Sequence, residues 1–98
     1  MPYITDEGIV NTVGPLPNEK EVEMARKWLQ EKAIRTVQLN KNSTSYGWKH
    51  VAEKYVKSYI SNGALIHAAM LEGFKVKQVL GTQNAYINIS KRSHYGNS

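Results

Sequence analysis

Residues 64–72 read ALIHAAMLE, and this stretch predicts a helix against which the other segments of the chain must pack. Apolar side chains surround it almost completely, with only His67 and Glu72 polar, which is typical of a buried helix. Gly73 fits the left-handed position that follows a helix, and Phe74 fits the apolar residue after it in a Schellman motif. Because such a helix has no face for solvent, we expect other elements to cover it.

Two amphipathic helices are predicted before this stretch. The first begins at Asn18, an N-cap residue that is followed three positions later by Glu21, as in a capping box. It is expected to end near Ala33. The second follows a serine-rich loop, and its apolar positions recur at steps of three and four residues. These positions are Trp48, Val51, Ala52, Tyr55, Val56, Tyr59 and Ile60.

Three further segments are rich in residues that favour β-strands. Residues 34–40, IRTVQLN, alternate in pattern and predict one strand. Residues 74–80 and 85–90, FKVKQVL and AYINIS, are joined by the turn residues GTQN and predict a C-terminal β-hairpin. The expected fold is therefore α+β, with about three helices packed on a small antiparallel sheet that includes the C-terminal β-hairpin.

The length of 98 residues favours a single domain over the whole chain. Residues 1–17 are predicted to be an extended arm with a short strand at Ile9–Val13, because Gly, Pro, Leu and Pro at 14–17 interrupt any regular element. Residues 91–98, KRSHYGNS, are expected to be a flexible tail.

The charge is unevenly distributed along the chain. Residues 1–33 hold six acids and four bases, a sum of −2, whereas residues 34–98 hold nine bases and two acids, a sum of +7. A basic region of this kind favours a polyanionic partner, either nucleic acid or an acidic protein face, although surface charge that only keeps the protein in solution gives the same pattern. Basic residues also occur at Lys75, Lys77, Lys91 and Arg92.

The candidate site lies in residues 40–55, NKNSTSYGWKHVAEKY, where a loop leads into the second helix. A helix N-terminus exposes unpaired N–H groups that attract anions. The alternative is a plain helix cap, with a hydroxyl of residues 43–45 as the cap and Tyr46 packed against the core. The candidate residues for contact with a partner or nucleic acid are Lys41, Ser45, Tyr46, Lys49, His50, Lys54 and Lys57.

Catalytic, metal and cofactor sites are not predicted. A phosphate-binding P-loop pattern is absent, and the pairing of Tyr46 or Ser45 with Lys49 lacks a nearby acid in sequence. The chain has no cysteine, and its three histidines do not show metal-ligand spacing. No run approaches the roughly 18 apolar residues of a membrane span, and the acidic first ten residues do not resemble a signal peptide. We therefore expect a protein that is not an enzyme and has no membrane contact.

The segments SYGWKH, YISNGALIHAAMLEGF and NAYINI resemble small hypothetical proteins of bacterial phages, plasmids and other mobile elements. The resemblance spans about residues 43–90 and carries no established activity or site residue. It implies a cytoplasmic protein in a bacterial host, where short proteins of such elements are commonly regulators or inhibitors of defence.

We therefore expect a small non-enzymatic binding protein that inhibits a host nucleic-acid-targeting defence complex, of anti-CRISPR or anti-restriction type. The alternative is a nucleic-acid-binding accessory or regulatory protein that uses the basic face of the second helix. The expected partner is a host protein, a ribonucleoprotein complex, or a DNA or RNA backbone. An apolar strand edge or an exposed Tyr86 would also allow a homodimer.

Overall fold

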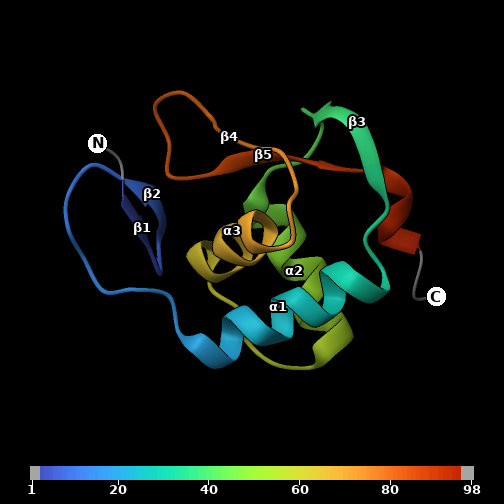
Figure 1. The fold of residues 1–98 in the computed structure, drawn as a ribbon, viewed down its shortest axis with the longest axis horizontal. Coiled ribbons are helices and arrows are strands. Elements are labelled where there is room, and N and C mark those ends of the chain that lie inside the picture. Colours follow the sequence, from blue (N-terminus) through green and yellow to red (C-terminus); the bar gives the residue numbers. More distant parts are fainter. Residues whose placement is uncertain (1–2, 96–98) are drawn as a thin grey trace.

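The computed structural model of the protein describes residues 3–95. Three helices lie against a three-stranded sheet, and a separate two-stranded hairpin lies at one end of the molecule (Figure 1). The elements in chain order are β1 Tyr3–Thr5, β2 Gly8–Val10, α1 Glu19–Glu31, β3 Arg35–Asn40, α2 Ser45–Val56, α3 Asn62–Leu71, β4 Val76–Gln78, β5 Ala85–Ile89 and the 3-10 helix Lys91–Tyr95. The predicted α+β class is confirmed.

Helix α3 occupies the centre of the fold, as its composition predicted. Helices α1 and α2 pack along it, the β1–β2 hairpin contacts it at one end, and the three-stranded sheet lies over the remaining side (Figure 1). The rings of Trp28 from α1 and Trp48 from α2 are both fully buried, with centroids 6.0 Å apart. Aromatic pairs at this separation supply large apolar area to a core, so the two tryptophans join α1 to α2.

The two ends of α3 follow simple capping chemistry. The N-cap is Ser61, whose hydroxyl accepts the N–H of Ala64 at 3.1 Å, so the helix begins at Asn62, two residues before the predicted stretch. At the other end, Gly73 adopts a φ of 81°, and the N–H of Phe74 donates to the carbonyl of Ala69 at 2.9 Å. This is the Schellman arrangement that the sequence predicted.

The first helix also begins where the sequence predicted. Asn18 is the N-cap of α1, and its side-chain oxygen accepts the N–H groups of Lys20 and Glu21. The helix ends at Glu31, two residues before the predicted end. Near its middle, the Nε of Arg26 donates to the carboxylate of Glu72 at 2.7 Å, which links α1 to the end of α3.

The three-stranded sheet has the order β3–β5–β4 with all neighbours antiparallel. The predicted C-terminal strands do pair, but β5 is the central strand because β3 adds to its other edge. The register between β3 and β5 is irregular, and the side chain of Asn88 replaces the missing strand contacts. Its Nδ2 donates to the carbonyl of Thr36 and its Oδ1 accepts the N–H of Lys75, both at 2.7 Å.

Both ends of the chain are more ordered than the sequence predicted. The arm of residues 1–17 forms the β1–β2 hairpin over Tyr3–Val10, and the predicted strand at Ile9–Val13 is β2, Gly8–Val10. The expected tail forms a 3-10 helix over Lys91–Tyr95, because the hydroxyl of the fully buried Ser93 accepts the N–H of Ile34 at 2.8 Å. Residues 96–98 of that tail lie outside the described residues.

The hairpin approaches the N-terminus of α3 at a glycine. The N–H of Gly63 donates to the carbonyl of Asp6 at 3.1 Å, in the turn between β1 and β2. A Cβ atom at Gly63 would lie 1.5 Å from the carbonyl oxygen of Thr5. Only glycine therefore lets the hairpin backbone lie directly on the helix.

Gly63→Ala should lower the free energy of unfolding by about 2 kcal/mol or more, because the methyl group overlaps backbone that cannot rotate away. Urea unfolding followed by circular dichroism measures this. Gly47→Ala is the matched control, since it lies near the start of α2 and its Cβ would meet nothing within 4 Å. The control should be neutral or stabilising by up to about 1 kcal/mol. Equal stability of the two variants would contradict the close approach.

Candidate functional site

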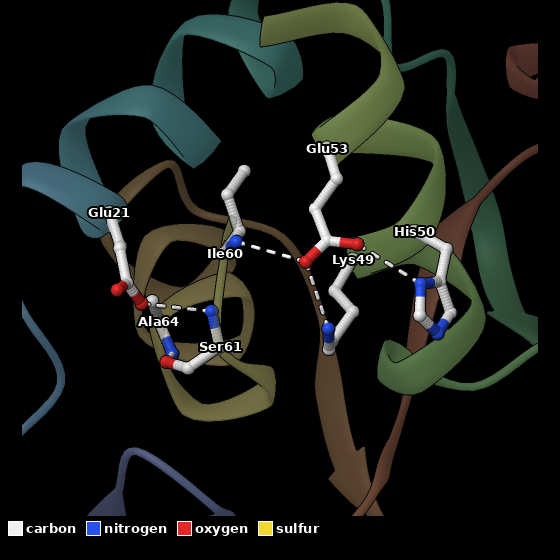
Figure 2. A network of polar contacts seen from close by, with 7 residues as sticks. All are labelled: Glu21, Lys49, His50, Glu53, Ile60, Ser61 and Ala64. Atoms are coloured by element: carbon white, nitrogen blue, oxygen red, sulfur yellow. Dashed lines mark hydrogen bonds and ion pairs between the residues drawn. The ribbon is translucent and has the colours of Figure 1, made fainter. Parts of the chain in front are cut away.

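The connection between α2 and α3 is held by a polar network (Figure 2). The carboxylate of Glu53 accepts the backbone N–H of Ile60 at 3.0 Å, and it also contacts the ammonium of Lys49 and Nδ1 of His50, each at 3.0 Å. One side chain of α2 thus satisfies a backbone donor of the loop that follows and holds two of the candidate site residues against its own helix. Both residues have a structural role in this arrangement.

A second carboxylate, which comes from α1, also accepts a hydrogen bond from the connection between α2 and α3. Glu21 Oε1 accepts the N–H of Ser61 at 2.9 Å, directly beside the N–H that Glu53 accepts (Figure 2). The sequence placed Glu21 in a capping box with Asn18, but the structure uses its carboxylate to connect α1 to the N-cap of α3. Two neighbouring backbone donors are therefore bonded to acids from two different helices, which fixes the path between α2 and α3.

Lys49 is buried beside this connection, and the prediction that it belongs to an exposed basic face of the second helix is wrong. Its exposed fraction is 6%, and its ammonium lies 4.7 Å from the ring centroid of Tyr59 and 5.5 Å from that of Tyr46. A buried ammonium needs such partners, and the Glu53 carboxylate together with two aromatic faces supplies them. Its charge is thus largely compensated within the protein.

Ser45 is also unable to meet a ligand. Its side chain is fully buried, and its hydroxyl accepts the N–H of Ala85 at 3.0 Å, which attaches the start of α2 to the start of β5. Thr44 is the N-cap of α2, and its side chain makes no capping hydrogen bond. The predicted alternative of a hydroxyl cap is therefore not what orders this loop; the contact between Ser45 and the sheet is.

The other five candidate residues are exposed, and of these Tyr46 and His50 lie beside Lys49, whereas the three lysines do not join them. The ring of Tyr46 lies edge-on to that of His50, with centroids 4.7 Å apart. Lys54 is exposed in the last turn of α2, and Lys57 is its left-handed C-cap with a φ of 59°. Lys41 is exposed in the turn after β3. The seven predicted residues thus divide into the buried Ser45 and Lys49 and five exposed positions, of which three lie on α2, one at its C-cap and one in the turn after β3.

The sequence did not indicate a concave apolar surface, which we call the hairpin groove. It measures about 810 Å³ and lies between α1, α3, strand β1 and the connection from β2 to α1. Several of its apolar side chains are at least two-fifths exposed, and Leu16 reaches 81%. The residues that line it are Tyr3, Ile4, Val13, Gly14, Leu16, Pro17, Glu19, Val22, Glu23, His67, Met70 and Leu71.

The groove could be missed because its residues belong to elements with other apparent roles. Leu16 stands between two prolines in a segment that the sequence only marked as a break. Met70 belongs to the helix predicted to be buried, yet its exposed fraction is 52%. Apolar residues beside prolines, and at the end of a helix, were the signal available for this surface.

The charge of the groove is opposite to that of the whole chain. Glu19 and Glu23 line its α1 wall, and no lysine or arginine is among the described residues that line it. His67 is half-buried and also lines the groove. The groove therefore combines apolar walls with an acidic edge.

Within residues 3–95, the histidines and acids do not assemble a group of three or more that could hold a metal ion. None of the helices in this same part of the chain is long and apolar enough to cross a membrane. Comparisons with known protein families, curated proteins and solved structures return no match.

The carboxyl of Glu53 has a shifted pKa. Burial alone raises the pKa of Glu53, but the hydrogen bond from the Ile60 N–H and the charge of Lys49 outweigh it and hold the pKa below its usual value. A carboxyl with a lowered pKa stabilises the folded state at pH values above its unfolded pKa, about 4.3, and this contribution is lost as the pH falls through the lower folded pKa.

Glu53→Gln should therefore lower the free energy of unfolding by about 2 kcal/mol at neutral pH, because a charged acceptor is lost and Lys49 stays buried. Its difference from the original protein should stay constant down to about pH 5 and shrink below about pH 4.3, where Glu53 becomes protonated in the unfolded chain while it is still charged in the folded protein. Urea unfolding at several pH values measures this.

Glu23→Gln is the matched control, because the side chain of Glu23 is 69% exposed and its ion pair with Arg26 is at the surface. It should change the free energy of unfolding by less than about 0.5 kcal/mol. A Glu53→Gln variant that is as stable as the original protein at neutral pH would contradict the role assigned to the network.

Proposed function

We propose that this protein is a non-enzymatic binding protein of a phage or other mobile element that acts in the cytoplasm of a bacterial host. Its target in this proposal is a host nucleic-acid-targeting defence complex of CRISPR or restriction type, which it inhibits by docking on a protein component. The observation that carries the proposal is the hairpin groove, where exposed apolar side chains gather on one concave surface.

Exposed apolar side chains are common singly, but a contiguous set that lines one groove is typical of an interaction site. Three walls of the groove are regular elements packed on one another: β1, which Gly63 allows to lie directly on α3, and the helices α1 and α3. The fourth wall is the irregular connection from β2 to α1. A preformed surface loses little conformational entropy on binding, so its apolar area contributes efficiently to affinity.

The chemistry of the groove favours a particular kind of segment on the partner. The apolar floor suits the apolar face of a helix or an extended strand, and Glu19 and Glu23 suit lysine or arginine beside that face. Proteins that hold nucleic acid are rich in such basic segments. A bound inhibitor would cover one of them, which is consistent with inhibition by occlusion.

The alternative function is a nucleic-acid-binding accessory that uses the basic face of α2. Lys54 and Lys57 are exposed on this helix, which favours the alternative. Lys49, however, is buried against Glu53, so the face offers less positive charge than the sequence indicated. The groove therefore supports protein docking more strongly than α2 supports contact with phosphates.

Leu16→Lys combined with Met70→Lys should reduce capture of the partner from nuclease-treated host lysate by about tenfold or more, because both changes place charge among apolar contacts and repel a basic segment. Quantitative mass spectrometry of the co-purified proteins measures this. The matched control is Val37→Lys combined with Leu80→Lys, which changes two apolar side chains that are 82% and 98% exposed and lie outside the groove.

The control should capture as much partner as the original protein, and both variants should unfold at similar urea concentrations. Equal capture by the groove variant and the control would reject the groove as the docking site. Inhibition is tested separately, by transforming a host with a plasmid that its defence system targets. If the original protein does not raise the transformation efficiency, docking stands but the inhibitor function is rejected.

A further inference from the structure

We propose that the outer face of the β3–β5–β4 sheet binds single-stranded nucleic acid, with Lys41, Tyr86 and Lys77 as its central contacts. This surface is separate from the hairpin groove, and the proposal is independent of the inhibitor function. It also differs from the basic face of α2, because the residues belong to the sheet and to the turn after β3.

The sheet and the segments beside it carry only positive charge. Residues 33–52 and 73–95 include all three strands and the 3-10 helix, and they contain no aspartate or glutamate. Every carboxylate of the chain therefore lies in the arm, in α1, or at Glu53 and Glu72 in the second half of the chain. The cations of the sheet and its flanking segments are Arg35, Lys41, Lys75, Lys77, Lys91 and Arg92.

The strand register places one of these cations, Lys77, beside an aromatic residue. Asn40 pairs with Ile87, and Ile87 pairs with Val76, so these residues cross the sheet together. In the next row, Tyr86 of the central strand pairs with Lys77. Lys41 is the residue after Asn40, in the turn after β3. Tyr86 thus lies on the central strand, with Lys77 beside it on β4 and Lys41 just beyond the end of β3.

The alternation of β5 shows which face carries Tyr86. Ala85 and Ile87 are fully buried, so the half-buried Tyr86 between them projects to the opposite face, where its neighbour Lys77 is exposed; Asn88, two residues further on that face, is buried by its bonds to the two edge strands. Figure 1 shows the three helices on one side of this sheet. Within residues 3–95, no helix covers the face that carries Tyr86.

Two of the six cations help to hold the sheet in place. Arg35 donates to the carbonyl of Gly73 at 2.8 Å, and Lys75 Nζ donates to the carbonyl of Val37 at 2.7 Å. The partner of Lys75 is neutral, so its positive charge stays available, whereas the charge of Arg35 is partly balanced by the nearby Glu72 carboxylate. In the described part of the chain, the side chains of Lys41 and Lys77 have no hydrogen-bond or ion-pair partner, so both are available for phosphates.

A single strand fits this face better than a duplex. Proteins that bind single strands combine aromatic rings, on which bases stack, with cations that follow the phosphates. A duplex hides its base faces, and sequence reading in its major groove needs a protruding helix or ribbon, which this face lacks among the described elements. Single-stranded DNA and RNA share the recognised chemistry of phosphate and exposed base.

Lys41→Glu combined with Lys77→Glu should weaken binding of a labelled oligothymidylate of about 12 nucleotides by at least about tenfold at roughly 50 mM salt. The slope of the logarithm of affinity against the logarithm of salt should fall by about 1.4, about 0.7 for each lost phosphate contact. Fluorescence anisotropy measures both quantities. Lys54→Glu combined with Lys57→Glu is the matched control, with the same charge change on α2.

The aromatic contact has its own pair of variants. Tyr86→Leu should weaken binding of the same oligonucleotide by about tenfold, because a stacking surface is lost, whereas Tyr86→Phe keeps the ring and should bind as the original protein does. Circular dichroism and urea unfolding confirm that both variants fold. A Tyr86→Leu variant that binds as tightly as Tyr86→Phe would reject stacking.

The proposal is overturned if the original protein binds neither oligothymidylate nor oligouridylate at low salt, or if a duplex of equal length binds more tightly than either. It is also overturned if the α2 control loses as much affinity as the sheet variant, since that result would assign binding to the helix face. Tighter binding of oligouridylate identifies RNA as the ligand, and tighter binding of oligothymidylate identifies DNA. None of these outcomes affects capture of a protein by the groove.

Discussion

Burial of α3 is the constraint on which the rest of the structure depends. Its seven buried residues include Leu65 and Ile66 at full burial, and an exposed apolar helix of this kind would be costly in water. The fold therefore surrounds it with α1, α2, the hairpin and the sheet, which are otherwise short elements with little core of their own. Gly63 shows how close this covering is, because even one methyl group would not fit beneath the hairpin.

The chain passes from α2 to α3 through a short connection, and acidic side chains stabilise this connection. Glu53 and Glu21 accept the adjacent N–H groups of Ile60 and Ser61, which the chain cannot pair with a regular helix or strand. Lys49 then balances the charge of Glu53 and is buried between two tyrosines. These charged side chains therefore stabilise the fold, and binding is left to other surfaces of the protein.

The two proposed binding surfaces carry opposite charges. The acids cluster in the first third of the chain, whose hairpin and α1 line the apolar groove, whereas the sheet is built from segments without any carboxylate. A protein with one apolar, acidic surface and one basic, aromatic surface can contact a protein and a nucleic acid at the same time. The proposed inhibitor of a nucleic-acid-targeting complex and the proposed single-strand contact are compatible for this reason.

The sequence by itself determined the elements that depend on local rules: the N-cap at Asn18, the Schellman end at Gly73, the second helix and strands β2 to β5, since capping and hydrophobic period act between near neighbours. It did not determine the end of the second helix, which stops at Val56 although the apolar pattern continues to Ile60. Only the tertiary structure decided what each polar side chain does, because its partners are distant in sequence. Ser45 meets Ala85 forty residues away, and Lys49 is covered by Tyr59 from beyond its helix. The groove and the basic sheet face likewise exist only once separate segments are packed together, so a pattern within one segment marks single apolar or basic residues but not the surface that they form.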